Sequence, residues 1–306
     1  MKQFIIRRIG YSLLSLFLLS LTIFLFVRVT GDPMTLLVEP GARPEDIEAM
    51  RHQFGLDQPL WVQYWLFVTS FLTGDLGQSF YYRTPVLELY FQRLPNSLVL
   101  AAVAMVLSLA IGIPSGILAA VRVGGFWDSF GKTFALLGLS LPQFWVGLVL
   151  ILFFSVYLGW LPSSGAGGIA HLLMPAFTLG WYFAAAHMRL TRSSMLEVLG
   201  SEYVKLARLK GLPESLVIGK HALKNALIPV ITLAGINLVV MINVAVVVET
   251  VFAWPGIGRL LYEGITFRDF PVVQCVVVIG GSMIIVVNLL VDILYAIIDP
   301  RIRLES

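Results

Sequence analysis

Long stretches without charged side chains constrain the fold of this chain most strongly. The ranges 9–27, 94–121, 133–188, 225–248 and 270–291 contain no Asp, Glu, Lys or Arg. A helix needs about 20 apolar residues to cross a bilayer. The range 133–188 is too long for one crossing, and the turn-rich stretch 160–168 divides it into spans at 133–158 and 172–188. The sequence therefore predicts six transmembrane helices, and the continuous rather than alternating apolar runs argue against strands.

The overall composition agrees with a membrane protein and excludes several other classes. Hydrophobic residues make up 58% of the chain and charged residues 13%, against about 45–50% and about 25% in soluble domains. This argues against a cytosolic enzyme. The single cysteine, Cys275, excludes a disulfide framework or a multi-cysteine metal site. The four histidines are widely scattered, so no metal cluster is expected.

The distribution of basic residues predicts the orientation. With the N-terminus inside, 14 of the 21 Lys and Arg residues fall in inner segments. The positive-inside rule then puts both termini in the cytoplasm, and this asymmetry explains the net charge of +3 better than nucleic-acid binding would. Lys2, Arg7 and Arg8 before the first span are also typical of a signal peptide. The apolar core is too long for one and no small-residue cleavage site follows, so we expect an uncleaved helix.

The outer segment 29–93 is too long for a simple connector. A short helix is expected to begin at Pro44 and to end at Gly55. The range 59–72 is apolar and aromatic but short for a span, so it is expected to lie at the interface or to pack on neighbouring helices. The segment either caps the outer mouth or meets a partner outside, and the sequence leaves both alternatives open.

The inner segment 189–224 holds half of the inner basic residues and many helix formers. It is interrupted once, at Gly211-Leu212-Pro213. Glycine supplies an unusual backbone angle and proline starts a helix, so this pattern predicts helix, sharp turn, helix. The segment is either a loop held by anionic lipid headgroups or a rigid projection on which a cytoplasmic motor acts.

Polar residues inside the predicted spans are candidates to face the bundle interior and to line a path. They are Gln143, His187, Asn237, Asn243 and Asn288. Asp292 is expected to pair with a basic residue near the inner face. Gly112 and Gly116 form a small-xxx-small pair, which predicts close helix packing. Gly131-Lys132-Thr133 lacks the earlier glycine of a P-loop, since Phe126 stands there.

Two stretches of the inner segment resemble the EAA loop of ABC importer permeases. They are Glu202-Tyr203-Val204-Lys205-Leu206-Ala207-Arg208-Leu209-Lys210-Gly211-Leu212 and His221-Ala222-Leu223-Lys224-Asn225-Ala226-Leu227-Ile228-Pro229. The variant is that of dipeptide, oligopeptide, nickel and glutathione permeases, in which the Glu-Ala-Ala triplet is replaced. Further motifs of the same family follow in order, among them Gly31-Asp32-Pro33, Gly74-Asp75-Leu76-Gly77, Thr191-Arg192-Ser193-Ser194-Met195, Trp254-Pro255-Gly256-Ile257-Gly258-Arg259 and Asp299-Pro300-Arg301. The chain looks most like the first permease of a pair.

The resemblance implies an all-α integral membrane protein with six transmembrane helices and the type I ABC importer permease fold. It implies an N-terminal helix at 1–28, an extracytoplasmic insertion at 29–93, and a five-helix core at 94–306 with the coupling loop at about 189–224. ATPase contact is expected at Glu202, Tyr203, Lys205, Leu206, Ala207, Arg208, Lys210, Gly211, Leu212 and Pro213.

The resemblance also implies a division of labour. A second permease subunit, two ATP-binding cassette ATPase subunits and an extracytoplasmic solute-binding protein would be the partners, in a bacterial or archaeal inner membrane. ATP and Mg would bind the ATPases, so this chain is expected to be non-catalytic and to hold no cofactor, metal or nucleic acid. The alternative is an ion-gradient-driven secondary transporter or channel, which needs inverted repeats or broken helices. An intramembrane enzyme would need a nucleophile–base pair, which the sequence does not offer.

Overall fold

The computed structural model describes residues 2–30 and 57–298, together with positions 45, 48 and 52. The described residues are almost wholly helical and contain no strand, only one bridge between Gln78 and Pro85. The short helix expected between Pro44 and Gly55 lies largely outside the described residues. The chain divides into two compact units, one formed by residues up to Pro95 with those from Gly256 onward, the other by Asn96–Pro255.

Five helices in the described residues are long and apolar enough to cross a membrane. They are α1 (Lys2–Thr30), α5 (Val86–Val121), α8 (Ile169–Leu199), α11 (Leu223–Val244) and α14 (Phe270–Ile298). At about 1.5 Å per residue, α5 is roughly 54 Å long. Since the hydrocarbon core of a bilayer is about 30 Å thick, part of α5 extends beyond it.

The range expected as the third crossing is a bent pair of helices. α6 (Phe126–Ser140) is followed by α7 (Gln143–Leu150), which continues as the π-helix η1 (Ile151–Tyr157). The two parts meet at 106°. Pro142 has no N–H to donate and disfavours helical geometry at Leu141, which is extended (φ −82°, ψ 133°). Counted as one crossing, this pair gives six spans. The span expected at 133–158 is therefore present as this pair, which begins earlier, at Phe126, and bends at the proline.

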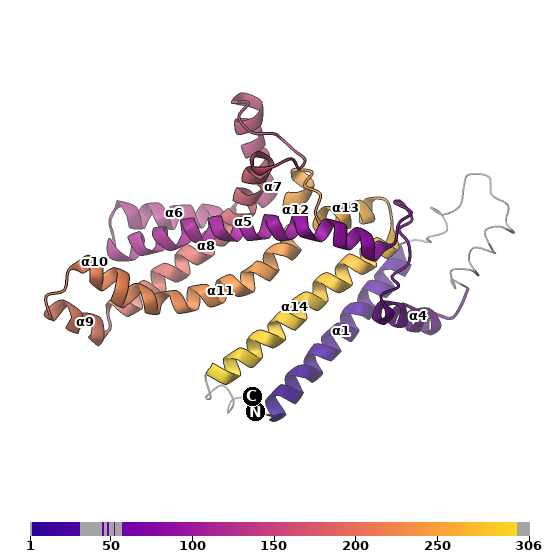
Figure 1. Ribbon diagram of the computed structural model, residues 1–306, viewed down its shortest axis with the longest axis horizontal. Helices are drawn as coiled ribbons and strands as arrows, with labels where there is room; N and C mark the ends of the chain where they lie inside the picture. Colours follow the sequence, from indigo (N-terminus) through magenta and orange to yellow (C-terminus); the bar gives the residue numbers. More distant parts are fainter. Residues whose placement is uncertain (1, 31–44, 46–47, 49–51, 53–56, 299–306) are drawn as a thin grey trace. The chain divides into compact units, whose positions relative to one another are not determined.

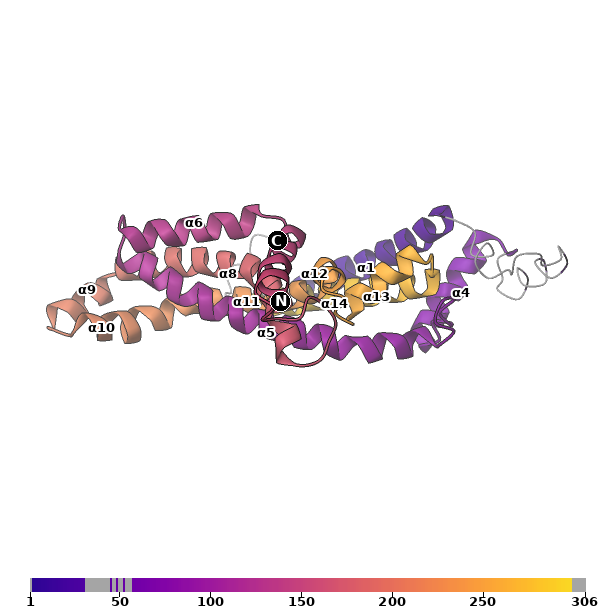
Figure 2. The same ribbon diagram turned by 90° about the horizontal axis from the view of Figure 1, so that it is seen from above.

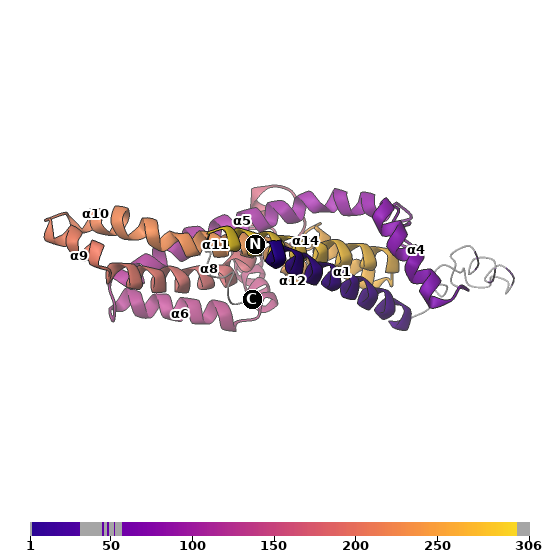
Figure 3. The same cartoon turned by 90° about the horizontal axis from the view of Figure 1, so that it is seen from below.

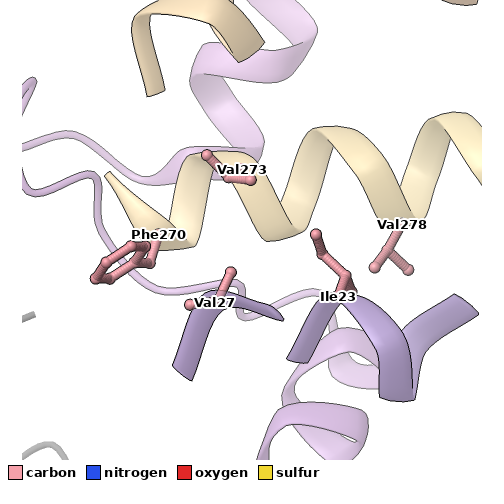
Figure 4. Close-up of a cluster of buried hydrophobic side chains, with 5 residues drawn as sticks. All are labelled: Ile23, Val27, Phe270, Val273 and Val278. Carbon is pink, nitrogen blue, oxygen red and sulfur yellow. The ribbon is translucent and has the colours of Figure 1, made fainter. Parts of the chain in front are cut away.

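In the first unit, α1 lies beside α14, as Figure 1 shows. Ile23 and Val27 of α1 form one buried cluster with Phe270, Val273 and Val278 of α14, and in Figure 4 Ile23 and Val27 point from α1 toward α14. The short apolar helix expected at 59–72 is α4 (Leu60–Thr73), and its residues Phe67 and Phe71 pack on this core. Gly74 ends α4 in the left-handed conformation (φ 78°).

Two carboxylates, those of the buried Asp269 and the half-buried Glu263, join the segment before α5 to the corner between α13 (Ile257–Thr266) and α14 in the same unit. Asp269 accepts hydrogen bonds from the Ser79 hydroxyl and from the Tyr81 N–H. Glu263 accepts a 2.6 Å bond from the Tyr82 hydroxyl. Burial and this bond raise the pKa of Tyr82 to about 12, so the phenol stays protonated and donates.

In the second unit, α8 is packed between α6 and α11 (Figure 2). The predicted close packing at Gly112 and Gly116 is confirmed. A Cβ on Gly112 would lie 2.8 Å from the Ala184 carbonyl oxygen, and a Cβ on Gly116 would lie 2.6 Å from Thr191 Cβ. The short helix α12 (Val246–Val251) carries the buried Glu249, which accepts a 2.5 Å bond from the Ser97 hydroxyl of α5. Small residues and buried hydrogen bonds thus hold this bundle together.

Candidate functional site

A helix–turn–helix protrudes at one end of the second unit, where Figure 3 labels α9 and α10. We call residues 202–222 the elbow. It consists of α9 (Glu202–Leu209), a turn, α10 (Glu214–Leu216) and the π-helix η2 (Val217–Ala222), which continues into α11. Glu202 in the first turn of α9 and Arg208 in the last complement the helix dipole. The helix, turn and helix expected from the sequence are present.

The turn of the elbow has a defined geometry centred on Gly211. This residue has φ +75°. Its N–H donates to the Arg208 carbonyl at 2.9 Å, and the Leu212 N–H donates to the Ala207 carbonyl at 3.4 Å. This pair of bonds is the Schellman arrangement, which satisfies the last carbonyls of a helix. Pro213 then caps α10 with its fixed φ of −65°. The turn is therefore a structured connection between two helices.

The inner face of the elbow is a small apolar core. Val204, Ala207 and Val217 are buried together, with Leu199 and Leu212 packed against them. A second apolar cluster includes Ala222, the last residue of the elbow. It joins this residue to Ala226 of α11, Ala120 of α5 and Met195 of α8. The elbow is thereby attached to the ends of three long helices, so that a force on α9 acts on all three.

The outer face of the elbow mixes apolar and charged side chains. Tyr203, Leu206 and Leu209 are exposed, Leu209 to 83%. Lys205 pairs with Glu202 at 2.8 Å, and Arg208 bonds Glu214 across the turn at 2.7 Å, which raises the pKa of the Arg208 guanidinium. Of the other residues expected to meet an ATPase, Lys210, Gly211 and Pro213 are exposed and Leu212 is half-buried, whereas Ala207 lies underneath in the apolar core.

The structure brings two of the predicted path residues together in the second unit. His187 of α8 is fully buried. Its Nδ1 lies 2.6 Å from the Ser108 hydroxyl of α5, and its Nε2 lies 3.3 Å from the Asn237 amide nitrogen of α11. Since an amide nitrogen only donates, Nε2 accepts and Nδ1 carries the proton that Ser108 accepts. Sequence reasoning missed Ser108, because a lone serine in an apolar span carries no signal of its partner.

The other predicted path residues do not join this triad. Gln143 is half-buried at the first position of α7. Asn243 donates to the Val239 carbonyl of its own helix at 3.0 Å. Asn288 is exposed on α14 in the first unit. The side chain of Asp292 lies outside the described residues, so its expected pairing stays a prediction.

A charged cluster that the sequence did not reveal lies near the elbow, where the turn between α5 and α6 meets α8. Asp128 is 1% exposed and receives three donors. Arg192 Nε and Lys132 Nζ each lie 2.8 Å from its carboxylate, and the Gly124 N–H lies 2.9 Å away. This cluster fixes the start of α6 to the C-terminal half of α8. No group of three or more His, Cys, Asp or Glu with metal-site spacing occurs among the described residues.

Known families and relatives match nearly the entire chain. A family model described as "Binding-protein-dependent transport system inner membrane component" matches residues 112–304, and the N-terminal model of the corresponding membrane component matches residues 1–101. The glutathione transport system permease protein GsiC of Escherichia coli K12 is 41% identical over 304 residues, which cover 99% of each chain. GsiC of Salmonella paratyphi A shows the same identity and coverage.

Solved structures share the fold at lower sequence identity. An inward-facing form of the MetNI methionine ABC transporter matches with a TM-score of 0.56 and 20% identity, over 70% of this chain and 98% of that chain. An amino acid ABC transporter matches with a TM-score of 0.52 and 15% identity, over 70% and 94% of the two chains.

Proposed function

Because the chain belongs to the family of binding-protein-dependent transport system inner membrane components, we propose that its elbow transmits the closure of separate ATPase subunits to a path through the bilayer. The chain is a permease subunit of an ATP-binding cassette importer, an all-α membrane protein with the type I permease fold. It is a transport protein rather than an enzyme. The hydrolysis of ATP is assigned to partner subunits.

The observation that carries this proposal is the apolar core beneath the elbow. A loop held by lipid headgroups needs no apolar core of its own, whereas Val204, Ala207 and Val217 bury one beneath α9. The exposed Tyr203, Leu206 and Leu209 then offer an apolar surface to a partner, and the flanking charges give it orientation. An element that docks on a moving ATPase passes the movement of that ATPase to the membrane helices. A transport cycle needs such a connection, because the path has to alternate between two states.

The proposed path runs past the polar triad of the second unit. His187 and Asn237, with Ser108, supply polar groups inside an otherwise apolar bundle, and such groups mark substrate pathways in membrane proteins. Gln143, Asn243 and Asn288 are proposed as further lining residues. A second permease of similar fold would complete the path.

The proposed substrate is a small peptide or a peptide-like solute. The similarity to a glutathione permease over 99% of the chain makes glutathione the first compound to test. An extracytoplasmic binding protein would deliver it to an outer mouth formed in part by the segment 29–93. We propose that the remainder, 94–306, is the permease core and that both termini lie in the cytoplasm of a bacterial or archaeal cell.

The test uses the complete transporter in proteoliposomes, with the binding protein and labelled glutathione on one side and ATP on the other. Uptake should require ATP and the ATPases, and should continue when ion gradients are collapsed. Replacing the two exposed elbow leucines with L206A/L209A should release the ATPases and abolish uptake. The exposed Leu118 of α5 is the matched control, and L118A should leave both intact. ATPases that remain bound to the elbow variant, with normal uptake, would exclude the proposed coupling.

A further inference from the structure

Two adjoining hollows lie in the first unit, whereas the elbow and the polar triad belong to the second. The first is a cleft of about 450 Å³ between the end of α1, α4, the loop 75–77 and the start of α14. The second is a groove of about 270 Å³ along α1, α4 and α14. Phe67 lines both, so the two hollows meet at α4. Figure 1 shows α4 beside α1, and residues of both helices line the two hollows.

The cleft carries charges of both signs. Arg28 enters from α1, with its Nε donating to the Gln63 side chain at 2.8 Å and its guanidinium 4.6 Å from the centre of the Phe24 ring. These two contacts fix the orientation of the guanidinium, which has further N–H groups to donate. Asp75 lines the same cleft, and Ser70 and Gln274 add polar groups. The size of the cleft is that of sites for small ligands, about 300–1,000 Å³.

The groove has the opposite character. Its walls are mainly aromatic and aliphatic, with Phe17, Phe71, Leu72 and Val278 among them. Ser20, Tyr64 and Ser282 also line it, and the Ser20 and Tyr64 hydroxyls bond each other at 2.8 Å. A peptide placed there would bury backbone polar groups without partners, which is unfavourable. A hydrocarbon chain has no such groups, so the groove suits one.

We propose that the cleft and the groove together bind one phospholipid with an ethanolamine headgroup. Its phosphate accepts hydrogen bonds from Arg28, its ammonium donates to the Asp75 carboxylate, and one acyl chain lies in the groove beside Phe71. The two charges of the headgroup match the two charges of the cleft. A purely anionic headgroup leaves Asp75 opposed to negative charge, and a choline headgroup has no N–H to donate to it.

This assignment gives α4 a specific role. Phe67 and Phe71 pack on the core between α1 and α14, while the neighbouring residues of the same helix line the hollows. A lipid seated there adds apolar contacts to all three helices. The bound lipid is thus a component of the first unit, and the composition of the surrounding membrane is expected to affect its stability.

The test is native mass spectrometry of the complete transporter, incubated with equal amounts of phosphatidylethanolamine, phosphatidylcholine and phosphatidylglycerol. One phosphatidylethanolamine per copy of this chain should survive detergent exchange, with a preference of about tenfold over the other two, as expected for a charge-assisted hydrogen bond. Equal retention of phosphatidylcholine, preference for phosphatidylglycerol, or no retained lipid would each overturn the assignment.

Three variants locate the site. R28Q and D75N remove the two headgroup partners, and S282F fills the groove from α14. Each should lower retained phosphatidylethanolamine about tenfold. The controls are E88Q, on the exposed side of α5, and V286F, on the exposed side of α14, which should retain it. If the variants fail to fold, a photoreactive phosphatidylethanolamine on the unaltered protein should label peptides of α4 and the start of α14. Labelling confined to other helices would overturn the assignment.

Discussion

Replacing Gly211 with proline tests the mechanical role of the elbow. Gly211 has φ +75°, whereas a proline ring holds φ near −65°. Proline also has no N–H, so the 2.9 Å bond to the Arg208 carbonyl is lost. Nothing lies within 4 Å of an added Cβ, so alanine fits at this position without crowding. Proline alters the direction of the turn but removes no side chain from the core beneath α9.

The size of the effect follows from these two changes. A left-handed residue other than glycine costs about 1–2 kcal/mol, and a lost backbone hydrogen bond costs about 0.5–1.5 kcal/mol. Alanine has only the cost of the left-handed conformation and keeps the hydrogen bond, so G211A should retain the turn with slight strain. Proline cannot take the conformation at all, so the chain must leave the turn and α9 loses its fixed angle to α10.

The assay measures ATP hydrolysis and substrate uptake in the same proteoliposomes. G211P should reduce uptake at least tenfold while ATP hydrolysis and membrane insertion persist, and G211A should retain most uptake. The matched control is Gly165, which also has a positive φ (+89°), has open space around its Cα and donates its N–H to the Phe252 carbonyl. G165P should affect folding yield but not the ratio of uptake to hydrolysis. Normal uptake by G211P would refute the reasoning.

Three further predictions concern packing and polar contacts. S108A leaves the buried His187 Nδ1 without a partner and should lower the free energy of unfolding by about 1–3 kcal/mol. The control is S115A, because the Ser115 hydroxyl donates to the Ile111 carbonyl of its own helix. Thermal denaturation of S115A should show little change. G112A places a Cβ 2.8 Å from the Ala184 carbonyl oxygen and should cost about 1–3 kcal/mol, while G235A, with nothing within 4 Å, should melt like the parent protein. The neutral Tyr82 phenol donates to Glu263, and its pKa is raised from 10.0 to about 12, so this contribution to stability is complete below pH 10 and is lost toward pH 12. The difference in melting temperature between the parent protein and Y82F should therefore be constant near neutral pH and shrink above pH 10. A constant difference at every pH would contradict this prediction.

The number and order of the membrane helices could be predicted because each apolar run is long enough to leave one solution. Their ends were less predictable. α5 begins at Val86, before the apolar run. Its first residues include the charged Glu88 and Arg93, and hydropathy does not detect a helix that contains them. Proline at position 142 favours a bend, but it does not specify an angle of 106°. The short α13 carried no signal strong enough to predict it.

The candidate sites also differ in how far the sequence could predict them. The elbow could be predicted because its signals are local, with glycine and proline at the turn and helix formers on both sides. The triad of Ser108, His187 and Asn237 could not, because it joins three helices 50 or more residues apart in sequence. The Asp128 cluster was missed for the same reason, since Arg192 lies 64 residues away. Contacts of this kind depend on which faces of the helices meet, and one sequence does not specify that.

The most direct test of the account is a cross-link from the tip of the elbow. Leu209 is the most exposed apolar residue there, and the native Cys275 is buried. L209C in the complete transporter, treated with a short thiol-to-amine cross-linker, should join this chain to an ATPase subunit, and the yield should change when ATP is added. A cross-link only to lipid or to other permease residues, with the ATPases fully bound elsewhere, would contradict the claim that the elbow is where the ATPases act.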